Sequence, residues 1–132
     1  MAAYNFTAFG HRNILAKHKT TLEFTKDSEI SKRADCIIGV NSDFDIIDLK
    51  KFVFGKRRVR IIICANNEKF EVNAILNEGF NDEREIVVRK TGFVSERTLG
   101  INADRAASDV PEKMAKLLQN PQQKIQIQIA EQ

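Results

Sequence analysis

Both histidines of this 132-residue chain lie in one short segment that also carries other groups able to do chemistry. The segment spans residues 10–25, and its candidate ligand-binding residues are Gly10, His11, Arg12, His18, Thr20, Thr21 and Glu23. The glycine permits close approach of a ligand to the backbone, and the cations and hydroxyls could hold a phosphate, a nucleotide or an RNA backbone. The segment therefore predicts a binding site for an anionic ligand.

Metal-assisted hydrolysis is the alternative chemistry for the same segment. His11, His18 and Glu23 could bind a divalent transition metal that activates water. If the flanking strands continue regularly, however, His11 lies on the outer face and His18 points inward, which separates them. A third interpretation is an ordinary hairpin loop, which Ile14 and Leu15 pin to the core. The sequence therefore assigns no metal site, catalytic residue or cofactor, and it leaves open whether the protein is an enzyme.

A second segment concentrates positive charge, although the net charge of the chain is only +3. Its cations are Lys50, Lys51 and the basic patch Lys56, Arg57, Arg58 and Arg60. Cations near the C-terminal end of a helix favour the helix dipole, which explains the charge without a ligand. A surface that contacts phosphates is the other explanation, and it keeps RNA open as a partner.

The elements that must position these residues occur twice along the chain. Residues 38–43 (Ile-Gly-Val-Asn-Ser-Asp) reappear at 99–104 as Leu-Gly-Ile-Asn-Ala-Asp. Apolar positions of further segments align in the same order: Phe6 with Phe70, Leu22 with Ile86, and Val59 with Ile125. The pattern predicts an internal duplication of a β-β-β-α-β unit, with one repeat over about 3–66 and the other over about 67–132. The counterpart of the 10–25 loop is acidic and has no histidine, which suggests a role beyond folding for the first loop.

Local signals predict the individual elements. Strict alternation over 124–129 indicates a strand that could form a sheet edge, and Asn66-Asn67 indicates a hairpin turn. An apolar stripe of Ile46, Ile47, Leu49, Phe52 and Val53 predicts the first helix, which a left-handed glycine at Gly55 ends. Asp109 and Glu112 have capping-box spacing for the second helix, and Asn41, Asp43, Asn102 and Asp104 are expected to cap helix N-termini. The predicted fold class is α+β, a mostly antiparallel or mixed sheet with two helices in a single domain over 1–132, either open or closed.

Composition limits where the protein can work. The longest apolar run, residues 61–65, is far too short to span a membrane, and residues 1–12 lack the apolar core of an export signal. A cytoplasmic location without membrane contact is therefore expected. Cys36 and Cys64 are accordingly expected to be reduced thiols in the core.

One resemblance accompanies these patterns. The motif Gly-His-x-Asn-Ile-x-Ala-x-His-x-Thr-Thr-x-Glu-Phe-Thr at 10–25, with 35–40 and 97–104, resembles a small archaeal family that carries only a domain-of-unknown-function label. The resemblance covers nearly the whole chain and implies no activity or catalytic residue. We therefore expect a cytoplasmic binding module for an anionic ligand such as RNA or a nucleotide. The alternatives are a small metal-assisted hydrolase and a homo-oligomeric scaffold, and the oligomeric state stays open.

Overall fold

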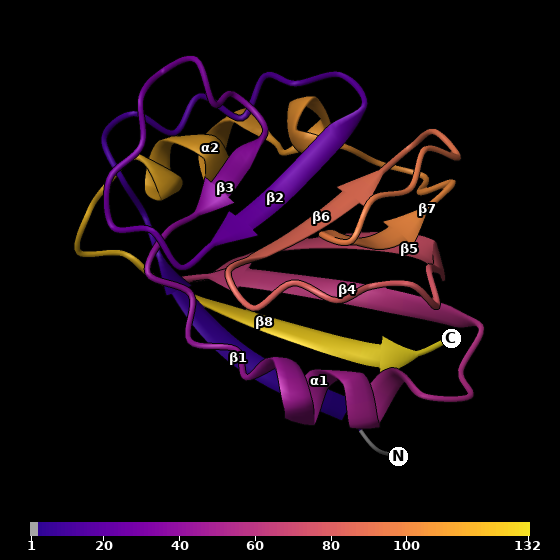
Figure 1. Ribbon diagram of the computed structural model, residues 1–132. Coiled ribbons are helices and arrows are strands. Elements are labelled where there is room, and N and C mark those ends of the chain that lie inside the picture. Colours follow the sequence, from indigo (N-terminus) through magenta and orange to yellow (C-terminus); the bar gives the residue numbers. More distant parts are fainter. Residues whose placement is uncertain (1–2) are drawn as a thin grey trace.

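The computed structural model describes residues 3–132 and confirms the α+β class, with one eight-stranded mixed sheet and two α-helices (Figure 1). The first half contains β1 (Ala3–Phe9), β2 (Thr21–Thr25), β3 (Ile37–Gly39), α1 (Ile46–Val53) and β4 (Arg58–Ala65). The second half contains β5 (Glu68–Leu76), β6 (Glu85–Arg89), β7 (Thr98–Ile101), the 3-10 helix η1 (Ala107–Asp109), α2 (Glu112–Leu118) and β8 (Lys124–Glu131). Both halves thus follow the predicted order of three strands, a helix and a strand.

The sheet closes on itself. Its strands lie in the order β1-β8-β4-β5-β7-β6-β2-β3, and only the pairs β2–β3 and β6–β7 are parallel. Phe9, at the end of β1, and Val40, directly after β3, exchange two backbone hydrogen bonds of 2.8 Å. These bonds join the two ends of the strand order, so the sheet is closed rather than open.

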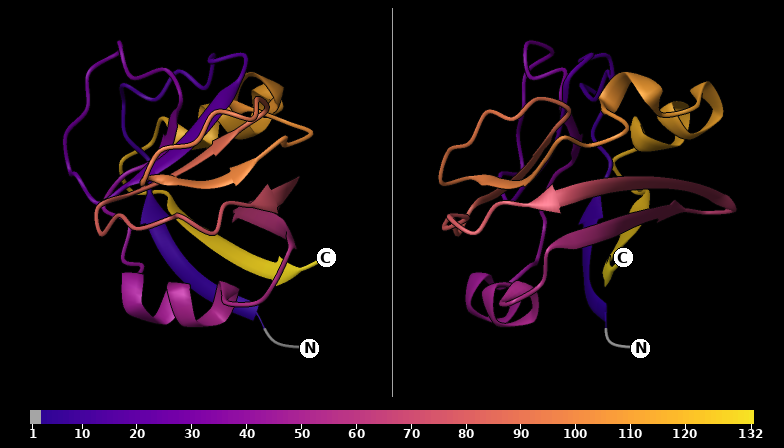
Figure 2. Two further views of the ribbon diagram at one scale, coloured as in Figure 1. Left: turned by 45° about the vertical axis from the view of Figure 1, so that its right-hand side comes forward. Right: turned by 90° about the vertical axis from the view of Figure 1, so that its right-hand side faces the viewer.

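The helices lie at opposite ends of the closed sheet, and the three views agree on this arrangement (Figures 1 and 2). Leu49 of α1 and Leu118 of α2 are completely buried in the same hydrophobic cluster as the inward-facing strand residues. In that cluster Phe6 packs edge-on against Phe24 and Phe44, with ring centroids 5.5 and 5.6 Å apart. Each helix therefore covers one end of the core. Within residues 3–132, no helix has the length and apolar character needed to cross a bilayer.

Corresponding hydrogen bonds occur in the two halves, and they correct one expectation. The Asp43 carboxylate accepts bonds of 2.7 Å from the backbone N–H and the hydroxyl of Thr7, and the Asp104 carboxylate accepts two bonds of 2.9 Å from Asn73. Neither aspartate caps a helix, because each one fastens the chain to the first strand of its own half. The cap of α1 is Asp45, which accepts from two backbone N–H groups of the first turn.

The same bonds revise the alignment of the halves at their first strands. Thr7 corresponds to Asn73, which shifts the expected match of Phe6 with Phe70 by two residues. Asn41 and Asn102 also correspond, and both have a left-handed backbone with φ of 52° and 49°. That conformation turns the chain and is tolerated well by asparagine. The common ancestry of the halves stays a prediction.

Several local predictions have clear outcomes. The hairpin turn is confirmed at Asn66, and the left-handed stop of α1 is confirmed at Gly55, with φ of 55° and 77°. The capping box of the second helix is wrong, because Asp109 lies in η1 and accepts from the backbone N–H of Ala106. Ile47 is also not part of the buried stripe, since 63% of it is exposed.

Two further expectations are corrected by the pairing of the strands. The final strand β8 is not a sheet edge, because it pairs with β1 on one side and β4 on the other. One argument for a scaffold that assembles through this strand is thereby removed.

Cys36 and Cys64 are free thiols as expected, but both are half-buried rather than part of the core.

Candidate functional site

The loop between β1 and β2 lies against the C-terminal end of α2. Gly10 donates its backbone N–H to the carbonyl of Gln123 at 3.0 Å, and His11 donates to the carbonyl of Leu118 at 2.9 Å. The side chain of Gln119 donates in turn to the carbonyl of Ile14, which is buried. The loop therefore covers the end of the second helix.

Gly10 is required by this cover. A Cβ atom at this position would lie within 2.5 Å of the carbonyl oxygens of Leu118 and Asn120. The close approach expected of this glycine is thus an approach to the protein's own carbonyl groups. Because these oxygens are electronegative, the surroundings of Gly10 do not favour an anion.

His11 is fixed within the loop on both sides of its ring. Only 7% of the residue is exposed. Its Nδ1 accepts a hydrogen bond of 3.0 Å from the backbone N–H of Asn13, and its Nε2 lies 3.3 Å from the Glu29 carboxylate. The neighbouring Arg12 points into solvent. The imidazole ring of His11 therefore stabilises the loop through its contacts with Asn13 and Glu29.

His18 has a similar local role at the other end of the loop. Its Nδ1 accepts from the backbone N–H groups of Thr20 at 3.2 Å and Thr21 at 3.1 Å. Thr21 is buried at the start of β2, whereas Thr20 is exposed. The three residues that the sequence singles out here thus form one turn.

These bonds have a consequence for metal binding. A backbone N–H can only donate, so Nδ1 of His11 and of His18 must be unprotonated, and in the neutral rings Nε2 carries the proton. A metal at Nε2 would require the proton to move to Nδ1 and would break the backbone bonds. In the part of the chain that the structure describes, no group of three or more His, Cys, Asp or Glu side chains is arranged to hold a metal ion. The geometry does not bring His11, His18 and Glu23 together.

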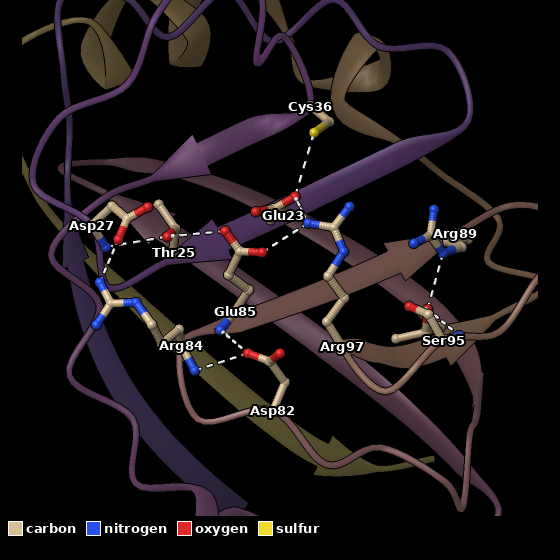
Figure 3. A network of polar contacts seen from close by, with 11 residues as sticks. Glu23, Thr25, Asp27, Cys36, Asp82, Arg84, Glu85, Arg89, Ser95 and Arg97 are labelled. Atoms are coloured by element: carbon tan, nitrogen blue, oxygen red, sulfur yellow. Dashed lines mark hydrogen bonds and ion pairs between the residues drawn. The ribbon is translucent and has the colours of Figure 1, made fainter.

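Glu23 instead belongs to a charge cluster between β2 and β6 (Figure 3). Arg97 lies 2.7 Å from the Glu85 carboxylate and 3.6 Å from that of Glu23. Only 3% of Glu23 is exposed, and burial raises its pKa to about 7, with a further increase from the neighbouring Glu85 carboxylate and a decrease from Arg97. One arginine thus faces two carboxyl groups, and a proton on Glu23 would make the trio neutral.

Cys36 completes the cluster without adding a nucleophile. Its thiol faces the Glu23 carboxylate, with Sγ 3.6 Å from Oε1. Burial first and then the charge of Glu23 raise the pKa of this thiol to about 12. Because the thiolate is the reactive form, Cys36 is unreactive at neutral pH. No local sequence pattern marks this cluster, since Glu85 and Arg97 are far from Glu23 along the chain.

The basic patch lies where α1 leads into β4, and its members differ in their contacts. The Lys56 ammonium donates to the carbonyl of Phe52 at 2.6 Å, and Arg60 lies 3.7 Å from Glu71. Arg57 and Arg58 are exposed and form no ion pair within residues 3–132. The patch therefore offers two cations that are free to contact a ligand.

An aromatic side chain lies in the same place, and the sequence reasoning missed it. Phe54 is 85% exposed at the C-terminal end of α1. One hollow beside it, of about 480 Å³, is lined by Ile47, Lys50 and Lys51. A second, of about 420 Å³, includes Lys56 among its lining residues. The spacing of these residues could have predicted this surface. Positions 47, 50, 51 and 54 share one helical face, which carries two apolar side chains and two cations.

We call this surface the α1–β4 corner. It consists of Ile47, Lys50, Lys51, Phe54, Lys56, Arg57 and Arg58. Cations beside an exposed aromatic ring can hold a phosphate backbone and stack on a base at the same time.

Comparisons with known proteins give the family of the chain. The uncharacterized protein MJ0206 of the archaeon Methanocaldococcus jannaschii is 34% identical over 117 residues, which cover 84% of this chain and 87% of that protein. The sequence profile of the family described as a domain of unknown function, DUF371, matches residues 6–132. This match and the archaeal relative confirm the resemblance inferred from the motifs, and the chain belongs to the DUF371 family.

Proposed function

We propose that this protein is a binding module for single-stranded RNA and that the α1–β4 corner is its contact surface. A cytoplasmic location is part of the same proposal. The observation that carries it is the exposure of Phe54 near Arg57 and Arg58, which form no ion pair within residues 3–132. Phe54 leaves 85% of its surface in water. Exposed aromatic and apolar groups of this kind are typical of surfaces that bind a partner.

The chemistry of the corner fits a nucleic-acid strand. Stacking of a base on an aromatic side chain contributes about 1–3 kcal/mol and tolerates any base. Arg57 and Arg58 can neutralise phosphates on either side of such a base, which releases counterions. Lys50 and Lys51, which line a hollow beside Phe54, add positive charge along the helix.

The contacts of the 10–25 segment explain why the proposal moves away from the histidines. Its glycine, its two imidazole Nδ1 atoms and the backbone of Thr20 and Thr21 are used to hold the loop in place. The exposed cations of the segment, Arg12 among them, belong to the loop against α2, at the other end of the closed sheet from α1. No contact in the structure favours the hydrolase alternative over RNA binding.

The test is fluorescence anisotropy with a labelled 12-nucleotide RNA of mixed sequence, titrated at several salt concentrations. Phe54→Ala should weaken binding at least about fivefold, because a stacking surface is lost. Phe93→Ala is the matched control, since Phe93 is also exposed (63%) but lies in the loop between β6 and β7. This control should bind as the wild type does.

Charge is tested separately with Arg57→Ala/Arg58→Ala. This variant should reduce the slope of log K against log salt by about 0.7 for each lost phosphate contact. Lys113→Ala/Lys116→Ala removes two exposed cations from α2 and should leave the slope unchanged. Equal effects of the two charge variants, or no salt-dependent binding by the wild type, would overturn the proposal. A dimer that Phe54→Ala dissociates would instead identify the corner as a contact between two copies of the chain.

A further inference from the structure

A groove lined by both polar and apolar residues, Phe6 and Ile127 among the apolar ones, crosses the outer face of the sheet over β1, β8 and β4. Its volume is about 530 Å³, and it is lined by side chains that alternate along these strands. The polar ones are Asn5, Thr7, Gln126, Gln128 and Asp43, beside Ile62 and Cys64. Neither helix lies over this face in the views of Figure 2, since α1 and α2 are at the ends of the closed sheet. The groove is therefore open to solvent along the sheet.

The three amides of the groove are available to a ligand. Asn5 lies directly opposite Gln128 across β1 and β8, and Gln126 is two residues further along the same face. Asn5 and Gln126 are exposed, and Gln128 is half-buried. In contrast to Asn73 and Asn77, which bind neighbouring groups, these three amide side chains form no hydrogen bond within residues 3–132. They present both donors and acceptors to whatever enters the groove.

The charge of the groove favours bases over phosphates. Asp43 is its one ionisable acid, and its two carboxylate oxygens each accept a bond of 2.7 Å from Thr7. No arginine or lysine lines the groove. A phosphate would therefore meet negative charge without compensation, whereas an exocyclic amino group of a base would meet acceptors.

The groove is continuous with the α1–β4 corner through one strand. Arg58, Arg60, Ile62 and Cys64 alternate along the outer face of β4, from the corner to the groove. Ile62 pairs with Gln128 and Cys64 with Gln126 across the β4–β8 ladder. A strand whose phosphates contact the arginines can thus place neighbouring bases over the amides.

We propose that this groove reads bases of the bound RNA, with Gln126, Gln128 and Asn5 as the specificity-determining residues and adenine as the preferred base. The inference rests on the proposed function. Glutamine and asparagine amides pair with adenine through two hydrogen bonds, to N6 and N7, and the Asp43 carboxylate is a further acceptor for an amino group. The corner supplies affinity for any sequence, and the groove supplies the preference.

The first test compares 12-nucleotide oligoadenylate, oligocytidylate and oligouridylate in the anisotropy assay. The wild type should bind oligoadenylate at least about fivefold more tightly than oligouridylate. Gln126→Ala/Gln128→Ala should bring this ratio close to one and leave the salt slope unchanged. Gln122→Ala, in the exposed turn before β8, is the matched control and should keep the preference. Thermal unfolding of each variant checks that the fold is intact.

Cys64 provides a second readout inside the groove. Bound oligoadenylate should slow the alkylation of Cys64 by iodoacetamide, followed by mass spectrometry, at least about threefold. Oligouridylate at the same concentration is the reference, because it should protect Cys64 less, and Cys36 should stay unmodified in both cases since burial raises its pKa to about 12. A chain that binds all three RNAs equally, or that keeps its preference in the double variant, overturns the base-reading role and leaves the corner intact. A wild type without salt-dependent binding overturns the proposed function itself.

Discussion

The C-terminal ends of the two helices occupy corresponding places in the fold, but only one of them is covered. At α2, the loop from Gly10 runs along the last turn and donates hydrogen bonds to Leu118 and Gln123. At α1, the equivalent bond from Leu76 to Arg57 is kept, but the chain then turns away, because Asn77 bonds to Leu99. Within residues 3–132, the last turn of α1 therefore has no second backbone bond of this kind, although the Lys50 side chain donates to Asn81 at 3.2 Å, and Phe54 lies in solvent.

This difference changes the interpretation of the first loop, which carries both histidines while its counterpart in the second half has none. The long first loop, with both histidines, looks like a ligand site when the sequence is considered alone. In the fold its unusual residues hold the cover of α2 in place. The corner at α1, which lacks such a cover, exposes cations and an aromatic ring. The proposed contact surface thus lies at the helix end that lacks the cover present on the other helix.

A single added Cβ atom at Gly10 should disrupt the contact between the first loop and the end of α2. Gly10→Ala should lower the free energy of unfolding by about 3 kcal/mol, because the added Cβ collides with backbone carbonyls that cannot move independently. Gly55→Ala at the end of α1 is the control: its φ of 77° is left-handed, but no atom lies within 4 Å of the added Cβ. It should cost about 1 kcal/mol, from backbone strain alone. Urea unfolding measures both, and equal losses would contradict the difference between the two ends.

The buried Glu23 of the charge cluster contrasts with the exposed cations of the corner. Burial in the folded state raises the pKa of Glu23 from its ordinary value of 4.5 to about 7, so the folded protein holds this proton more tightly than the unfolded chain does. The resulting stabilisation is complete below about pH 4.5 and is lost as the pH rises to 7. Between pH 5 and 8 the wild type should lose up to about 3 kcal/mol from this group.

Glu23→Gln isolates the contribution, because the amide keeps the shape of a protonated carboxyl and cannot titrate. The stability of the wild type minus that of the variant, measured by urea unfolding at each pH, should fall between pH 5 and 7 and then level off. A difference that stays flat across the range would show that Glu23 is ionised throughout.

The smallest effect on stability is expected at the end of α1. Phe54→Ser should change the free energy of unfolding by less than about 0.5 kcal/mol, because the side chain is already in water. Leu118→Ala, at the covered end, should lower it by about 3 kcal/mol, since Leu118 is completely buried. If Phe54→Ser destabilised the protein strongly, Phe54 would pack against the fold and would not be available to a ligand.

Local sequence signals were sufficient for much of the fold. Alternation and turn residues predicted the strands and the hairpin at Asn66, and Gly55 marked the end of α1, because each depends on neighbouring residues alone. The contact of Asp43 with Thr7 and that of Glu23 with Arg97 could not be predicted in this way. They bring together segments far apart in the chain, whose register is set by the closed sheet. Ile47 was assigned to the core because an apolar residue near a buried stripe has the same local pattern whether it points in or out.

The closure of the sheet also has a consequence for how the protein is made. The first strand, β1, pairs along its whole length with β8, and its contacts with the first half include the bridge between Phe9 and Val40, the bonds of Thr7 to Asp43 and side-chain packing. On the ribosome, β1 emerges before all other strands, and its main partner is synthesised only at residues 124–131. The two strands with the greatest separation in sequence must therefore find each other last, a long-range step that slows folding. Until β8 is made, the backbone hydrogen-bonding groups along this edge of β1 lack their partner strand, and such an edge is prone to aggregation.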